Sequence, residues 1–205
     1  STLDGTVADT ETLALDSGAG DITFGGAVGA GTSLGDVTVT AAATVDATGT
    51  FAANSFTQVA GSVLTDFQDA VTTTGNFTFA GTDLRLRDAA HSVGGAMGLT
   101  NAGTFTTDAN ANVTVNGAFT QVGGGTNSLG GDITSTTAGI NFLDAVTLTD
   151  GVAMDSNAGG GNIVFQSTLD GTVADTETLA LDSGAGDITF GGAVGAGTSL
   201  GDVTV

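Results

Sequence analysis

The stretch STLDGTVADTETLALDSGAGDITFGGAVGAGTSLGDVTV occupies residues 1–39 and returns without a single change at residues 167–205. The chain therefore holds one complete 166-residue unit, residues 1–166, followed by the start of a second identical unit, residues 167–205. Identical tandem copies are typical of repeat proteins, whose copies stack on one another to build length or to multiply a surface. This pattern does not favour a pair of independent enzyme domains.

The strand signal inside this stretch is a short alternation of apolar and polar residues. Ile22-Thr23-Phe24 and Val37-Thr38-Val39 each place two apolar side chains on one face and a threonine on the other, the period-2 pattern of a half-buried strand. A glycine followed by Asp or Asn precedes these triplets and others like them, at residues 20–21, 35–36, 75–76, 131–132 and 161–162. A glycine with positive φ before Asp or Asn predicts a corner that leads into each strand.

Short strands in irregular sub-repeats predict an all-β fold, a parallel β-helix (β-solenoid) built from tandem 166-residue repeats. With about 20 residues in each turn, the unit makes about eight turns and is about 40 Å long. We expect phenylalanines in the interior, namely Phe24, Phe77, Phe79, Phe142 and Phe165. A hairpin-rich fold stays open, because Asp4-Gly5, Asn116-Gly117 and Asp150-Gly151 are dipeptides that tight hairpins prefer.

The charge of the chain restricts its partners. Twenty-two acidic residues against two arginines give a net charge of −20. This charge repels nucleic acid and anionic lipid, so we expect neither as a partner, and it keeps a long apolar array soluble. A hydrophobic fraction of 40% argues against disorder. No apolar run approaches the ~18 residues of a membrane helix, so we expect no membrane span between residues 1 and 205.

The phrases GDITFGGAVGAGTSLGDVTVT (20–40), GAFTQVGGGTNSLGGDITS (117–135) and GGGNIVFQSTLDGT (159–172) resemble the large β-strand-repeat surface proteins of bacteria. These are the filamentous-haemagglutinin-like and autotransporter-like giant adhesins. The likeness is one of repeat style and composition, and it extends over essentially the whole chain. It implies a right-handed parallel β-helix on the outside of a bacterial cell, and it transfers no catalytic motif.

Few residues suit catalysis. His91 is the single histidine, next to Ser92 and near Asp88, but a catalytic triad needs groups that converge in space. We therefore expect a surface or turn histidine and no enzyme activity. One histidine and no cysteine leave almost no means of binding a transition metal.

Two pairs of carboxylates have the composition of a glycosidase site: Asp66 with Asp69, and Asp144 with Asp150. Enzymes of this architecture that cleave acidic polysaccharides need basic residues for the substrate, and the two arginines of this chain are too few. Solvated turn carboxylates are the better interpretation of both pairs.

Arg85 and Arg87 are the only cationic side chains, and their alternation with leucines predicts that both point outward from one strand. The simpler account is local pairing with the flanking Asp83 and Asp88, which is weak when exposed. The other account is a docking point for an acidic neighbour in a bundle of rods.

Calcium is the one ligand that the sequence leaves open. Asp residues beside Gly corners resemble the loops that offer oxygen ligands to this ion, and Asp16 and Asp21 are the best local candidates. The nonapeptide repeat GGxGxDxUx of calcium-binding β-rolls is not met, because no nine-residue period follows Asp21. We expect no other cofactor.

The sequence thus predicts a structural, extracellular repeat protein that forms a rod, fibre or stalk on a bacterial surface, as the shaft of a filament or adhesin. The expected partners are further copies of the repeat in cis, neighbouring filaments and cell-surface components. The alternative is an adhesive module that binds carbohydrate or calcium along the face of the rod, although the lack of Trp and Tyr argues against sugar stacking.

Overall fold

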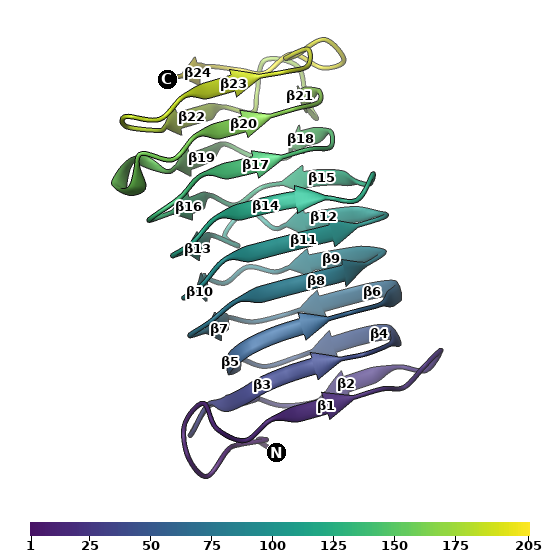
Figure 1. The fold of residues 1–205 in the computed structure, drawn as a ribbon. Helices are drawn as coiled ribbons and strands as arrows, with labels where there is room; N and C mark the ends of the chain where they lie inside the picture. The colour runs from purple at the N-terminus through teal and green to yellow at the C-terminus, as the bar shows by residue number, and fades with distance from the viewer.

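The computed structural model describes residues 1–205 apart from the side chain of Asn157, and the chain winds into a rod of stacked turns (Figure 1). Each turn contributes short strands to three faces, which we number in chain order. Face 1 consists of β1 (Leu13–Leu15), β3 (Leu34–Val39), β5 (Phe51–Gln58), β8 (Phe77–Gly81), β11 (Met97–Asn101), β14 (Phe119–Val122), β17 (Ile140–Phe142), β20 (Ile163–Phe165) and β23 (Ile188–Phe190).

Face 2 consists of β2 (Ile22–Phe24), β4 (Ala42–Ala47), β6 (Gly61–Phe67), β9 (Asp83–Leu86), β12 (Thr104–Thr107), β15 (Thr126–Leu129), β18 (Val146–Leu148) and β21 (Leu169–Gly171). Face 3 begins with single bridges from Leu3 to Val28 and from Val28 to Phe51, at the start of β5. It continues through β7 (Val71–Thr73), β10 (His91–Val93), β13 (Val113–Val115), β16 (Ile133–Ser135), β19 (Val152–Asp155), β22 (Leu179–Asp182) and β24 (Val203–Thr204). A 3₁₀ turn, η1 (Asn157–Gly159), lies between β19 and β20.

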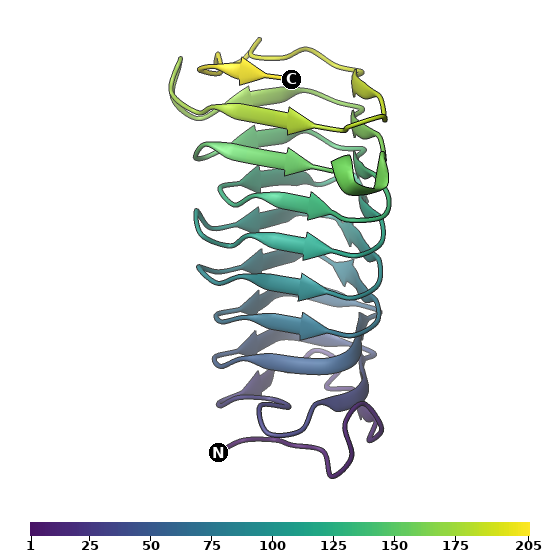
Figure 2. The ribbon, with the colours of Figure 1, turned by 90° about the vertical axis from the view of Figure 1, so that its left-hand side faces the viewer.

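All strand pairs in the described chain are parallel, as the sequence predicts. In Figure 1 the face 1 strands in front run to the right and the face 2 strands behind run to the left while the chain climbs, so the coil is right-handed. Figure 2 shows the same stack from the side, with the two termini at opposite ends. The fold is therefore a right-handed parallel β-solenoid.

The length of a turn varies because the corners differ. Val37 pairs with Phe56 in one turn and Ile163 pairs with Ile188 in another, and the second of these turns contains more residues than the first. The hairpin dipeptides lie in the corners: Asn116-Gly117 joins β13 to β14, and Asp150-Gly151 joins β18 to β19. The chain therefore turns to the next face at these positions instead of folding back on itself.

The interior is filled by the alternate residues that the triplets predict. Phe77, Phe79, Phe142 and Phe165 are all buried, whereas Phe24 is only half-buried. Phe24 differs because β2 pairs with β4 on one side only, so one side of the ring lacks a covering turn. Rings of successive turns are in contact along the rod, as in the 5.1 Å between the centroids of Phe119 and Phe142 and the 5.8 Å between Phe142 and Phe165.

The glycines before Asp or Asn have a different role from the expected one. Within the described chain their φ angles are not positive, and at Gly131 and Gly161 the need for glycine comes from close approach to the neighbouring turn. A Cβ on Gly161 would lie 2.0 Å from the carbonyl oxygen of Ala138, and one on Gly131 would lie 2.3 Å from that of Ala111. Real Cβ atoms do not approach an oxygen so closely, so any larger residue would push two turns apart.

At four of these five corners the Asp or Asn that follows the glycine accepts a backbone hydrogen bond from the adjacent turn. Asp36 instead accepts from the side chains of Asn54 and Ser55. Asn76 Oδ1 accepts from the N–H of Ala96 at 2.9 Å, and Asp132 Oδ1 accepts from the N–H of Ala153 at 2.7 Å. Asn162 accepts from Asp187 in the same way. Corner amides fall outside the strand ladders, and an unpaired amide near the interior is costly, so these side chains extend the ladder across the corner.

Replacing Phe119 by alanine tests the packed interior. Phe119 is fully buried between Phe105 and Phe142, so Phe119→Ala should lower the free energy of unfolding by about 3–5 kcal/mol, measured by urea denaturation. Phe190→Ala is the matched control, because Phe190 is 37% exposed and should cost clearly less. Equal costs at the two positions would contradict an interior at Phe119.

Candidate functional site

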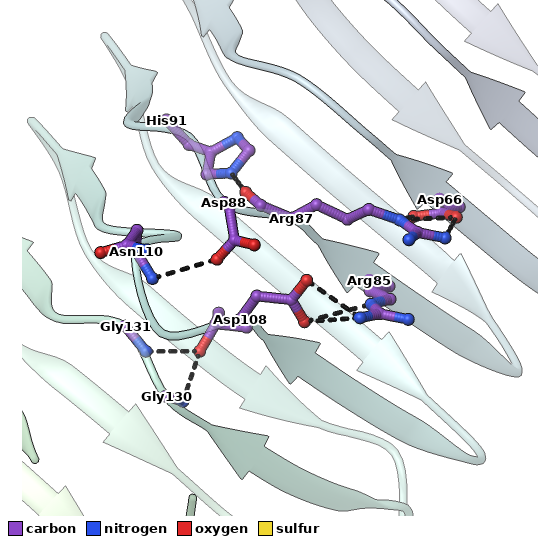
Figure 3. A network of polar contacts seen from close by, with 10 residues as sticks. Asp66, Arg85, Arg87, Asp88, His91, Asp108, Asn110, Gly130 and Gly131 are labelled. Atoms are coloured by element: carbon purple, nitrogen blue, oxygen red, sulfur yellow. Dashed lines mark hydrogen bonds and ion pairs between the residues drawn. The ribbon is translucent and has the colours of Figure 1, made fainter. Parts of the chain in front are cut away.

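Arg85 lies in β9 and Arg87 directly follows this strand. Both arginines form ion pairs with side chains of neighbouring turns (Figure 3). Arg87 donates from Nε and Nη2 to Asp66 of β6, the shortest contact being 2.5 Å, and Arg85 donates to both oxygens of Asp108, which follows β12. The expected partners Asp83 and Asp88 are not the observed ones. Asp83 accepts from the N–H of Thr104 and Asp88 from that of Asn110.

This arrangement relieves a conflict between like charges on face 2. The outward residues Asp46, Asp66 and Arg85 are register neighbours in successive turns, so two carboxylates lie side by side in the ladder. Adjacent like charges in a sheet are destabilising. Asp66 is 6% exposed, and its hydrogen bonds with Arg87 raise the pKa of the guanidinium above its usual value. The arginines therefore neutralise carboxylates between turns, which the sequence neighbours alone do not reveal.

A double-mutant cycle on Asp66→Asn and Arg87→Gln should measure a coupling free energy of about 1–2 kcal/mol in favour of the pair. The equivalent cycle on Asp108→Asn and Arg85→Gln is the control. Its coupling should be about half as large, because the Asp108 side chain is 18% exposed against 8% for Asp66. Urea denaturation at low and high salt gives both values, and a coupling near zero for Asp66 and Arg87 would contradict this account.

His91 is buried, contrary to the expected surface position. It takes the first inward place of β10 with 2% of its surface exposed. Nδ1 lies 3.2 Å from the N–H of Val71, which donates to it, and Nε2 lies 3.1 Å from the carbonyl oxygen of Arg87. Both ring nitrogens are therefore engaged with backbone when the ring is neutral and Nε2 carries the proton. Burial lowers the pKa of His91 below its ordinary 6.5.

Acidification should destabilise the protein through His91. The unfolded chain takes up a proton near pH 6.5 and the folded chain resists, so stability that is full above pH 6.5 is lost as the pH falls below that value. The melting temperature should therefore drop between pH 7 and pH 5. In His91→Gln, which cannot titrate, it should stay nearly constant over the same interval. A parallel decline in both proteins would assign the effect to other groups.

All four carboxylates of the two pairs are held by a guanidinium, by backbone N–H groups or by a side-chain amide. Asp66 binds Arg87, and Asp69 accepts from the N–H of Ala70. Asp144 accepts from Gln121 Nε2 and from the N–H of Gly124, both at 2.9 Å, whereas Asp150 accepts from the N–H of Gly151. These contacts give each carboxylate a structural partner.

Asp16 and Asp21, the calcium candidates, make separate local contacts. Asp16 Oδ1 accepts from the N–H of Gly18 at 3.0 Å, and Asp21 Oδ1 accepts from the N–H and the hydroxyl of Thr44 in the next turn. Among the residues that the structure describes, no three His, Cys, Asp or Glu side chains gather as a metal site would require. Calcium binding at Asp16 and Asp21 stays a prediction.

Melting curves with calcium and with a chelator test this prediction. A bound ion stabilises the folded state, so calcium should raise the melting temperature, and Asp21→Asn should abolish the rise. Thr147→Ser on an unrelated outward position is the control for the substitution. Identical curves with and without calcium would remove the ion from further consideration.

A buried cluster of amides was missed in the sequence. Gln121 Nε2 donates to Asn101 Oδ1 at 2.8 Å, and Asn127 Nδ2 donates to Gln121 Oε1 at 3.0 Å, with all three residues almost fully buried. Gln58 occupies the matching position in β5 and accepts from Thr65. The signal for these residues was present, because each glutamine lies two residues after an inward phenylalanine in Phe-Thr-Gln and so shares its face.

A projecting segment at residues 4–12, which we call the edge loop, has the same internal contacts in both copies. Glu11 accepts from the hydroxyl of Thr6 and the N–H of Val7, and these contacts lower the pKa of its carboxyl. Glu177 repeats the arrangement with Thr172 and Val173. The left-handed φ of +59° at Asp9 recurs as +61° at Asp175. The loop is therefore a fixed structure that the sequence specifies locally.

Comparison with known proteins gives one significant relative among the curated proteins. The chain is 32% identical over 211 aligned residues to outer membrane protein A of Rickettsia rickettsii. The alignment takes in 95% of this chain but only 8% of that protein, so the chain spans a small part of its relative's length. No family model and no solved structure matches the chain. In the described part of the chain, no helix is long and apolar enough to cross a membrane.

Proposed function

We propose that this chain is a structural segment of a bacterial surface protein, in which copies of the 166-residue unit build a rod, fibre or stalk. The observation that carries the proposal is the continuity of the stack where the second copy begins. β21, β22 and β23 belong to the copied segment, and they pair in register with β18, β19 and β20 of the preceding unit. Each added copy therefore lengthens one rod instead of forming a separate domain.

The relative and the surface chemistry support an extracellular location. The related rickettsial protein is an outer membrane protein, and repeated acidic faces keep neighbouring rods apart or let cations bridge them. The proposed partners are further copies in cis, neighbouring filaments and components of the cell surface, without nucleic acid. The shaft would hold an adhesive region away from the cell, as in a filament or adhesin.

The proposal includes no catalytic role and no cofactor. It draws on the engagement of both His91 nitrogens with backbone and on the structural partners of the paired carboxylates.

Carbohydrate binding along the rod is the alternative function. One observation favours it, because outward polar residues line up on face 1 on both sides of Gly98, namely Thr38, Thr57, Thr78, Thr120 and Asn141. Phenylalanines serve the interior, however, and among the described residues Phe190 alone is an exposed aromatic side chain.

Tandem arrays of two, four and six complete units test the rod. Small-angle X-ray scattering should give a constant cross-section and a length that rises by about 37 Å for each added unit, at about 4.8 Å per turn. A cross-section that grows with copy number would overturn the rod.

The location is tested on cells that produce the protein. An antibody to the unit should label the exterior of intact cells, and label confined to the cytoplasm would contradict the surface assignment.

A further inference from the structure

The two copies of the repeated segment lie on different faces of the rod. Leu13–Leu15 (β1) lies on face 1, but its copy in β22 (Leu179–Asp182) lies on face 3. Likewise β2 (Ile22–Phe24) lies on face 2, whereas its copy β23 lies on face 1. Every segment of the second copy is displaced by one face in the same sense, so the displacement belongs to the unit and not to a local distortion.

The displacement follows from the number of strand positions in the unit. From β1 the chain makes seven complete turns to β20 on the same face, and two further faces lead through β21 to β22. The unit thus contains seven and two-thirds turns. Eight complete turns would return the chain to the same face, and the unit ends one face short of this. Because the solenoid has three faces, each copy is rotated about the rod axis by one third of a revolution relative to the copy before it.

The edge loops follow this rotation. The first loop, residues 4–12, lies at the corner between face 3 and face 1, and its copy at residues 170–178 lies at the corner between face 2 and face 3. Figure 2 shows the purple first loop and η1 on the right-hand side and the yellow-green second loop on the left. Their contacts with the next turn also agree, since Asp9 accepts from Ser33 at 2.6 Å and Asp175 from Ser199 at 2.7 Å.

We propose that an array of these units carries the edge loop on its three edges in turn, so that each edge of the rod presents the loop once in every three copies. Three copies make 23 turns and return to the starting edge after about 110 Å, at about 4.8 Å per turn. A unit with a whole number of turns would instead place every copy of the loop on one edge of the rod. For copies beyond residue 205 this inference rests on the proposed rod. For residues 1–205 it does not.

The rotation itself is measurable in the present chain, whether or not the protein is a surface rod. Spin labels on Ala8→Cys and Ala174→Cys lie at exposed, equivalent positions of the two loops, and the native sequence has no cysteine to interfere. Their distance by pulsed electron paramagnetic resonance should clearly exceed the axial offset of about 37 Å, because a lateral separation adds to it.

Ala8→Cys with Ala158→Cys is the matched reference, because Ala158 lies seven complete turns further along the same edge. That pair should give a distance close to its axial offset of about 34 Å. Two distances that differ only by the few ångströms of axial offset would place both loops on one edge and overturn the proposal. Both variants should melt near the parent temperature, so that misfolding cannot imitate either result.

Discussion

Stacking each turn directly on the one before is the constraint on which the rest of this structure depends. The turns are joined by parallel ladders on three faces, and every backbone amide must find its partner in the next turn. This requirement determines which residues the corners accept. Gly161 and Gly131 allow backbones to approach where a Cβ would collide, and Asp132 and Asn76 accept the amides that the ladders leave out. The absence of proline fits the same requirement, since proline removes a ladder donor.

Much of this architecture could be predicted because it depends on local pattern. Triplets such as Val37-Thr38-Val39 announce an inward and an outward face, and the observed burial follows that alternation. The same rule places His91 and Gln121 inside, because each lies two residues from a buried apolar residue and so shares its face. Polarity favours exposure and alternation favours burial, and at these two positions alternation decides. The backbone and amide contacts that satisfy them come from other turns, which sequence spacing does not reveal.

The remaining features depend on which residues of successive turns lie next to one another. The local sequence pattern does not specify this pairing. Arg87 binds Asp66 because the two residues are 21 positions apart in a turn of about that length, not because they are near in sequence. The corners differ in length, so no single sequence period relates each residue to its neighbour in the next turn. The pairing therefore cannot be read from sequence spacing. The displacement of the second copy has the same origin, since it requires a count of strand positions that only the paired structure supplies.

The direction of the ladders has a mechanical consequence. Hydrogen bonds between turns run along the rod, so a pull on its two ends loads the turns one after another instead of shearing all of them together. A turn of about 20 residues shortens the rod by about 5 Å when it peels away, yet releases about 70 Å of extended chain. A tether built in this way would lengthen many-fold under load and absorb energy in small, successive steps, each recoverable when the turn winds back onto the exposed end.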